Sequence, residues 1–307
     1  MHQGLKTLLI GSSLLLAAPA AFAQGDDASG GGGGSATVGA GADANAGGAG
    51  AGATAAAGGD MAMGAWSDQL INNPQTLPKG AIGLGGTFEI LSLSFTDPVT
   101  MTSVSSTAEA LFLEADYGVS DKLTVGVGYG LNVHNDAGTF QDFPKGPLDI
   151  HGAFNLVHKD KLSVTAGADF DINLDNTDDK SIHAGLSAKY MVAPKIALYT
   201  GNPIPMGPAG QHLSIGLGTN GPITFAVPVG VALQASPQLF AFVDTTLASF
   251  SISNSSNAFI FSDFIPVNVG ALYRAAKDLD VGVTFQDDLK HAGDFYVVGL
   301  TARYYKH

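Results

Sequence analysis

The stretch Leu123–Val133, LTVGVGYGLNV, decides the fold class of this chain, because its large side chains occur at every second residue. Leu162–Ile172 (LSVTAGADFDI) and Ile223–Leu233 (ITFAVPVGVAL) repeat this alternation. A period of two is typical of β-strands with one apolar face. Ordinary strands average about 5–6 residues, whereas a strand that crosses a bilayer at a tilt needs about 9–11. These longer runs therefore favour a membrane barrel over a soluble sandwich.

Short turns alternate with longer polar loops from residue 79 onward. Five turns, such as Val119–Lys122 and Ala235–Gln238, separate six loops, such as Asn135–Gly146 and Ser251–Asp263. This alternation is typical of the two ends of an outer-membrane barrel, and it predicts an all-β, antiparallel up-and-down transmembrane barrel of about 12 strands. Both ends of the barrel are expected on the short-turn side. The expected strands are residues 79–95, 104–118, 122–134, 147–158, 161–174, 181–191, 195–202, 222–235, 238–250, 264–274, 278–287 and 294–305.

Four tyrosines lie at the short-turn ends of expected strands and share the parity of the apolar face. They are Tyr117, Tyr190, Tyr273 and Tyr304. Amphipathic rings at the headgroup level form the aromatic girdle of membrane barrels. High β-propensity would explain any one of these tyrosines, but it explains four in phase less well. We therefore predict that the four tyrosines form a girdle at the lipid interface.

With these features the chain resembles the porin-like outer-membrane β-barrel proteins of Gram-negative bacteria. The resemblance covers residues 79–307, and it rests on Tyr117–Leu123 (YGVSDKL), Leu233–Leu239 (LQASPQL) and the closing Val297–Tyr305 (VVGLTARYY). It implies an outer-membrane location, contact with lipid and lipopolysaccharide, and insertion by the barrel assembly machinery, which reads an aromatic-rich terminal strand. The terminal residue here is His307 instead of the usual Phe. The resemblance is architectural and identifies no functional subfamily.

The strand face opposite the apolar one is expected to line the lumen. Its charged and polar residues are Glu114, Asp116, Asp149, His151, Asp169, Asp171, His183, Lys189, Asp244, Arg274, Asp280 and Arg303. A barrel wider than eight strands can hold a channel. The barrel region has 22 acidic and 13 basic residues, so an open pore would favour cations or neutral solutes. The alternative is a closed lumen, in which Lys189, Arg274 and Arg303 pair with Asp116 and Asp280.

The N-terminal region is expected to precede the barrel as two segments. Residues 1–23 combine a short apolar run with a small-x-small ending at Ala21 and Ala23, which predicts a cleaved export signal. Residues 24–78 are predicted to be a disordered Gly/Ala-rich tether, because few of their side chains are large enough to offset the entropy of ordering. Met61–Pro78 allows a short amphipathic turn. The sequence leaves open whether this turn enters the lumen, lies on a membrane surface or leads into the first strand.

The composition excludes several classes of protein. The chain has 14 basic against 27 acidic residues and no run of Lys or Arg, whereas a nucleic-acid-binding protein needs a basic stripe. It contains no Cys. Disulfide scaffolds, thiol chemistry, zinc sites built on Cys and a lipid-anchoring Cys are therefore excluded.

We find no motif that predicts a catalytic, cofactor or metal site. Gly216–Gly221 matches GxGxxG, but Pro222 and a strand pattern follow it where a phosphate site needs a helix. His134, His151 and His183 lie on different strands without metal-ligand spacing, so we expect ordinary lumen residues. No His falls on an apolar strand face, and no GxSxG is present. We therefore expect no enzyme, no cofactor and no metal.

The sequence predicts a porin-like channel for the passive passage of small neutral or cationic solutes. A closed structural or loop-presenting barrel is the alternative, and an outer-membrane enzyme or a secreted soluble β-protein is a weaker one. Homo-oligomers are common among porins, and the sequence identifies no interface for one.

Overall fold

The computed structural model describes residues 67, 69–96, 103–135, 147–159, 161–174, 180–201, 213–216, 223–252, 259–261 and 265–306. The predicted signal peptide with Ala21 and Ala23, and the predicted tether up to residue 66, lie outside the described residues. The described part contains β-strands and a single turn of 3₁₀ helix, η3 (Leu70–Asn72). None of its helices is long and apolar enough to cross a membrane.

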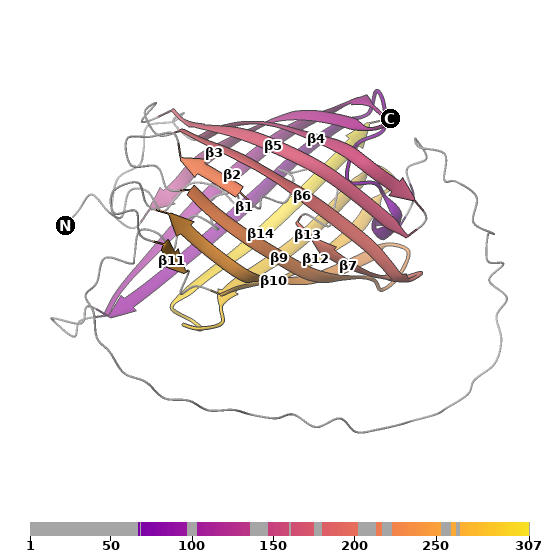
Figure 1. Cartoon of the computed structure of the whole chain (residues 1–307). Helices are drawn as coiled ribbons and strands as arrows, with labels where there is room; N and C mark the ends of the chain where they lie inside the picture. Colours follow the sequence, from indigo (N-terminus) through magenta and orange to yellow (C-terminus); the bar gives the residue numbers. More distant parts are fainter. Residues whose placement is uncertain are drawn as a thin grey trace, which may run out of the picture.

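The strands follow one another around a closed antiparallel barrel (Figure 1). They are β1 (Ile82–Thr96), β2 (Ser103–Ser120), β3 (Leu123–Asn135), β4 (Pro147–Lys159), β5 (Leu162–Asn173), β6 (Lys180–Ala193), β7 (Ile196–Thr200), β8 (Leu213–Gly216), β9 (Ile223–Gln234), β10 (Leu239–Ile252), β11 (Phe259–Phe261), β12 (Pro266–Ala276), β13 (Leu279–Asp288) and β14 (Phe295–Lys306). β1 pairs with β2 on one side and with β14 on the other, which closes the ring.

The 14 strand segments occupy 12 positions in the wall. β7 and β8 both pair with β6 and β9, so they are successive parts of one position. β11 and β12 share a position in the same way, because both pair with β10. The predicted 12-strand barrel is therefore confirmed, with both ends of the wall on the short-turn side.

The position formed by β7 and β8 differs from the single expected strand at residues 195–202. β7 ends at Thr200, and β8 continues the position from the alternating stretch Leu213–Gly216. On β9, the residues between the parts paired with β7 and with β8 include Pro228. Proline has no backbone N–H to donate, so it suits a place where the ladder is interrupted.

The two faces of the wall differ in the way that the alternation predicts. On β3, Val125 and Val127 are exposed, whereas Thr124 between two outward positions is buried. On β6, Leu186 is exposed and His183 is buried. Exposed apolar side chains of this kind surround the whole ring. A continuous apolar belt of that extent requires lipid instead of water around it.

The four tyrosines of the predicted girdle point outward at the short-turn end. Tyr117, Tyr190, Tyr273 and Tyr304 are between 45% and 52% exposed. Each lies opposite a residue that begins or nearly begins the paired strand, such as Ile82 for Tyr117. The structure thus places them at one height on the outer face, and their contact with lipid headgroups stays a prediction.

Candidate functional site in the barrel lumen

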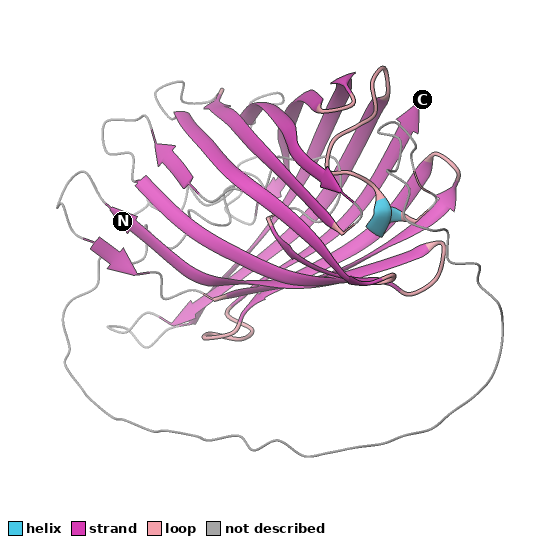
Figure 2. Cartoon of the chain, turned by 45° about the vertical axis from the view of Figure 1, so that its right-hand side comes forward, coloured by secondary structure: helices cyan, strands magenta, loops and turns pink. Residues whose placement is uncertain are grey.

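Residues 69–78, called here the N-terminal segment, cross the lumen at the short-turn end of the barrel. The backbone N–H of Ile71 donates to Gln234 Oε1 on β9 (3.1 Å), and that of Leu77 donates to Thr124 Oγ1 on β3 (2.7 Å). Since β3 and β9 are far apart in the ring, the segment spans the opening. Figure 2 shows its helical turn at the same end of the barrel as the C-terminus. The segment that the sequence analysis assigned to the tether therefore ends inside the barrel.

The wall holds the N-terminal segment through both polar and apolar contacts. Lys189 Nζ donates to the backbone oxygen of Asn73 (2.6 Å), and Arg274 donates to that of Ser67 (3.1 Å). Leu70 and Ile71 are 1% and 0% exposed. They form an apolar cluster with Ala197, Tyr199, Ala232, Phe240 and Leu272. Wall side chains bond to the backbone of Ile71, Asn73 and Leu77, and Leu70 and Ile71 are buried, so the segment forms an ordered plug at this end.

One arc of the inner wall, from β2 to β6, brings histidines and carboxylates together. His151 on β4 reaches toward β2, where its Nε2 lies 2.8 Å from Asp116 Oδ1 and 3.7 Å from Glu114 Oε1. Its other ring nitrogen, Nδ1, contacts Asp149 Oδ1 on the same strand. We call Glu114, Asp116 and His151 the His151 cluster. Both ring nitrogens of His151 thus face carboxylates.

A second group of one histidine and two carboxylates adjoins the first. His183 Nδ1 on β6 lies 2.9 Å from Asp169 Oδ2 and 3.4 Å from Asp171 Oδ2, both on β5. We call these three residues the His183 cluster. Asp149 is the register partner of Asp171 between β4 and β5, so Asp149 lies between the two clusters. Together they form one continuous acidic band.

A glycine makes room for the contact between Asp116 and His151. Gly126 on β3 is the register partner of both residues, since β3 lies between β2 and β4. A Cβ added at Gly126 would collide with Asp116 Oδ1 and His151 Nε2. Only glycine therefore lets these side chains meet across the intervening strand.

On the opposite arc, from β7 to β13, the buried carboxylates are paired with donors. Tyr199 donates to Asp244 Oδ2 (2.7 Å), and Asn268 donates to Asp244 Oδ1 (2.6 Å). Arg274 pairs with Asp280 through two bonds of 2.9 Å and 3.2 Å. The Asp280 side chain is completely buried. Asp244 and Asp280 therefore each have donors of their own.

The structure places all twelve predicted lumen residues on the strand face opposite the exposed apolar side chains. Those that are buried are Asp116, His151, Asp169, Asp171, His183, Lys189, Arg274 and Asp280, and those that are half-buried are Glu114, Asp149, Asp244 and Arg303. Of the expected ion pairs, Arg274–Asp280 is present. Asp116 contacts His151, and Lys189 bonds to the N-terminal segment. His134, expected with the other lumen histidines, is exposed. That any of these residues lines a conducting path stays a prediction.

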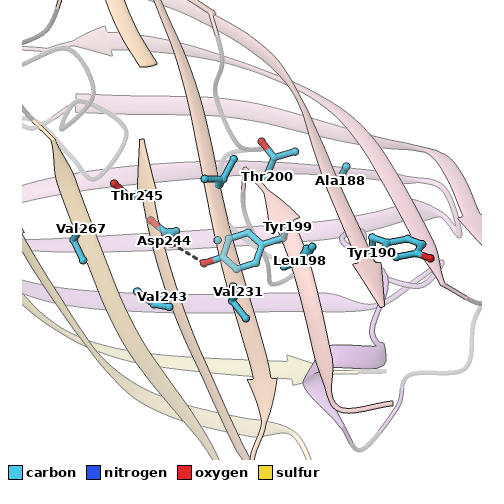
Figure 3. Close-up of a pocket in the computed structure, with 12 residues that line it drawn as sticks. Ala188, Tyr190, Leu198, Tyr199, Thr200, Val231, Val243, Asp244, Thr245 and Val267 are labelled. Atoms are coloured by element: carbon cyan, nitrogen blue, oxygen red, sulfur yellow. Dashed lines mark hydrogen bonds between the residues drawn. The ribbon is translucent and has the colours of Figure 1, made fainter. Parts of the chain in front are cut away.

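A hollow of about 590 Å³ lies against the wall beside β7 (Figure 3). Most of its lining side chains are apolar and point outward, among them Leu198, Val231 and Val243. The hydrogen-bonded pair of Tyr199 and Asp244 borders it from the inward side (Figure 3). An apolar recess on the outer face suits an acyl chain better than a polar solute.

No family model matches the sequence, and no curated protein matches it. Among solved structures, the COG4313 outer membrane channel from Pseudomonas putida F1 has a similar fold. The TM-score is 0.54 at 10% identity, over 76% of this chain and 98% of that one. The KdgM porin gives a TM-score of 0.44 at 7% identity, over 72% of this chain and 99% of that one. The first likeness establishes the fold, and identities this low carry nothing finer.

The closed barrel, its apolar outer belt and its similarity in fold to a solved outer-membrane channel all indicate a barrel that spans a membrane. The chain is a closed transmembrane β-barrel with an apolar outer belt, and its fold is similar to that of a solved outer-membrane channel. This fold confirms the expectation that followed from the alternating strands.

The two His–carboxylate clusters were not predicted, because the ligands of each cluster come from two strands and show no metal-ligand spacing along one strand. A usable signal was present in the hairpin geometry. His151 and Asp169 lie equally far from the turn between β4 and β5, and so do Asp149 and Asp171. In an antiparallel hairpin, residues equidistant from the turn are cross-strand neighbours. The contact across Gly126 had no such signal, because a long loop separates β3 from β4.

Proposed function

We propose that this protein is a porin-like channel for the passive passage of small neutral or cationic solutes across the outer membrane. The observation that carries the proposal is the acidic band on the inner wall, formed by Glu114, Asp116, Asp149, Asp169 and Asp171 around two histidines. A wall lined by charges of one sign attracts counter-ions and repels ions of the same sign. The band therefore favours cations and disfavours anions.

In this proposal the N-terminal segment gates the channel, because solutes pass the short-turn end only when it moves. Burial of Leu70 and Ile71 stabilises the closed state by about 1.5–3 kcal/mol for each side chain. The entropy of ordering the segment opposes closure. The segment should therefore leave the opening when the burial of these two side chains is made unfavourable.

A closed barrel that conducts nothing is the second candidate, and the same segment favours it. Leu70, Ile71 and Leu77 are buried across the opening, and most of the charged inner side chains are buried as well. A barrel of this kind would serve to present its long loops or to attach the N-terminal region to the envelope.

Single-channel recording in a planar bilayer separates the two candidates. The measurement uses folded residues 24–307 under a salt gradient, together with the double variant Leu70→Asp/Ile71→Asp, whose buried carboxylates would expel the segment. Leu289→Asp, on an exposed loop residue, is the matched control. A gated channel predicts rare cation-selective openings of the wild type and of the control, and frequent openings of the double variant. A double variant that inserts, folds and stays silent would favour the closed barrel.

A further inference from the structure

We propose that the inner wall binds divalent transition-metal ions at two neighbouring sites, the His151 cluster and the His183 cluster. Each cluster offers one imidazole nitrogen and two carboxylate oxygens, and within each cluster these atoms lie within 4.8 Å of one another. Binding at these sites does not depend on conduction, so the proposal stands whether the barrel is a channel or not.

The distances within each cluster suit a metal ion. Ligand atoms 2.0–2.2 Å from a shared ion are separated from each other by about 2.9–3.5 Å in tetrahedral or octahedral geometry. In the His151 cluster, the histidine nitrogen lies 2.8 Å and 3.7 Å from the two carboxylate oxygens. In the His183 cluster, the corresponding distances are 2.9 Å and 3.4 Å. Small side-chain movements would therefore place all three ligands around an ion in each cluster.

A buried carboxylate oxygen supplies independent evidence for the His151 site. The Asp116 side chain is 1% exposed, and its Oδ2 atom accepts no hydrogen bond from any residue that the structure describes. Asp149 Oδ2, between the two clusters, is buried and lacks a donor in the same part of the chain. Leaving such an atom unsatisfied costs about 1–3 kcal/mol, more for a charged group. A cation at the cluster would remove the cost at Asp116.

The second nitrogen of His151 is held in the manner of a metal-binding histidine. Its Nε2 faces Asp116 and Glu114, while its Nδ1 contacts Asp149 Oδ1. A histidine that binds a metal through one nitrogen almost always donates its other N–H to a carboxylate, a carbonyl or water, which fixes the tautomer and the ring orientation. Asp149 is therefore the positioning residue of this site.

The balance of charge on the band also calls for cations. Asp116, Asp149 and Asp171 form no ion pair with Lys or Arg within the described ranges. These three carboxylates contact two histidines, so a negative charge would be left even with both imidazoles protonated. A divalent ion at either cluster would offset this charge.

The mixed ligand set indicates the class of metal. Ca²⁺ and Mg²⁺ prefer sites made entirely of oxygen atoms. Imidazole together with carboxylate suits ions such as Mn²⁺, Fe²⁺, Co²⁺ and Zn²⁺. We therefore assign the two sites to this second class, with Co²⁺ as a spectroscopic probe and Zn²⁺ as a competitor.

The test is a Co²⁺ titration of tag-free, chelator-stripped barrel folded in detergent, followed by visible absorption and by metal analysis of the dialysed protein. We expect two Co²⁺ ions per chain, displaced by Zn²⁺ and not by Mg²⁺. His151→Gln and His183→Gln should each remove one ion, and the double variant should remove both. Asp244→Asn, a carboxylate of the opposite arc, is the matched control and should retain two.

A milder variant separates positioning from folding. Asp149→Asn keeps the shape of the side chain and should weaken the His151 site about tenfold, as loss of the partner of a ligating histidine does, while the His183 site changes less. Each variant is titrated only if its circular dichroism spectrum matches that of the wild type. Asp116→Asn replaces His151→Gln if the latter does not fold.

Three results would overturn the proposal. One is a folded wild type that binds no Co²⁺, and another is a double His variant that binds as much as the wild type. A single ion that either His substitution abolishes would replace the two sites by one shared site. A silent barrel that still binds two ions would count against the channel and leave the metal sites intact.

Discussion

The two arcs of the inner wall share one construction, in which a glycine lets side chains of neighbouring strands meet. They differ in how their carboxylates are paired. On the β2–β6 arc, Asp116 and His151 meet across Gly126, and on the β7–β13 arc, Tyr199 and Asp244 meet across Gly230. In both places a glycine on the middle strand leaves room for side chains from the two neighbouring strands to touch. On the first arc, Asp116 Oδ2 and Asp149 Oδ2 accept no hydrogen bond from the described residues. On the second arc, Asp244 and Asp280 are bonded to donors.

The difference between the arcs assigns a task to each. The β7–β13 arc, called here the neutral arc, also contributes Ala232, Phe240 and Leu272 to the apolar cluster around Leu70 and Ile71. It therefore anchors the plug. The β2–β6 arc, called here the acidic arc, contacts the plug through hydrogen bonds of Thr124 and Lys189. Under the proposed function, one side of the lumen is a structural support and the other attracts cations.

Removal of Arg274 should break the neutral arc with the largest effect. Arg274→Ala leaves Asp280 buried without this partner, which costs about 3–5 kcal/mol when a buried pair is broken. Urea unfolding of the liposome-inserted barrel measures the loss. Replacing both members by leucine should cost much less, because no charge is then stranded. Equal losses in the single and double variants would show that the pair has no such role.

The two bridging glycines should respond alike to an added methyl group. Gly126→Ala and Gly230→Ala each force a Cβ into a neighbouring side chain, and overpacking of this kind costs about 1–3 kcal/mol. Gly152→Ala is the control, since the nearest atom to its Cβ would be at 3.6 Å. The measurement is the free energy of unfolding of the three variants under the same conditions. A loss for Gly152→Ala as large as the losses for the other two variants would refute the shared construction.

Loss of the tyrosine hydroxyl should have a smaller effect on the neutral arc. Tyr199→Phe removes one hydrogen bond to Asp244 and keeps the one from Asn268, so we expect a loss of about 0.5–1.5 kcal/mol. The same unfolding experiment measures it. A loss above that of Gly230→Ala would mean that Asp244 depends on Tyr199 alone.

Neutralising the acidic arc should change selectivity and leave stability nearly untouched. Asp149→Asn/Asp171→Asn removes two charges from the wall, each worth about 1 kcal/mol to a cation at 4 Å in water-like surroundings. In the frequently opening Leu70→Asp/Ile71→Asp background, the reversal potential should show a severalfold lower preference for cations. Asp244→Asn should leave the potential unchanged, and an equal shift for both would erase the distinction between the arcs.

Much of the wall was predictable from the sequence, because alternation is a local property. Val125, Val127 and Leu186 reveal their outward face by parity alone, and turns such as Lys277–Asp278 mark the hairpins. The interrupted position of β7 and β8 was harder, since the ladder breaks beside Pro228 on β9, a strand that follows in the chain.

The contents of the lumen were less predictable, because they depend on pairings between distant residues. Leu70 and Ile71 belong to a short segment without a periodic pattern, and their partners on β7, β9, β10 and β12 come from across the ring. The contact of Asp116 with His151 requires the register on both sides of β3. Neither can be obtained from the composition or spacing of a single strand.

Residues 69–78 occupy the lumen, and the absence of native Cys allows a direct test of this placement. Ile71→Cys and Leu289→Cys are each introduced alone, and the rate of labelling by a charged, water-soluble thiol reagent is measured in the folded barrel. Ile71 is 0% exposed and Leu289 is 62% exposed. The account predicts that the thiol at position 71 is strongly protected until the barrel is unfolded, while the one at position 289 reacts at once. Equally fast labelling at both positions would contradict the plug.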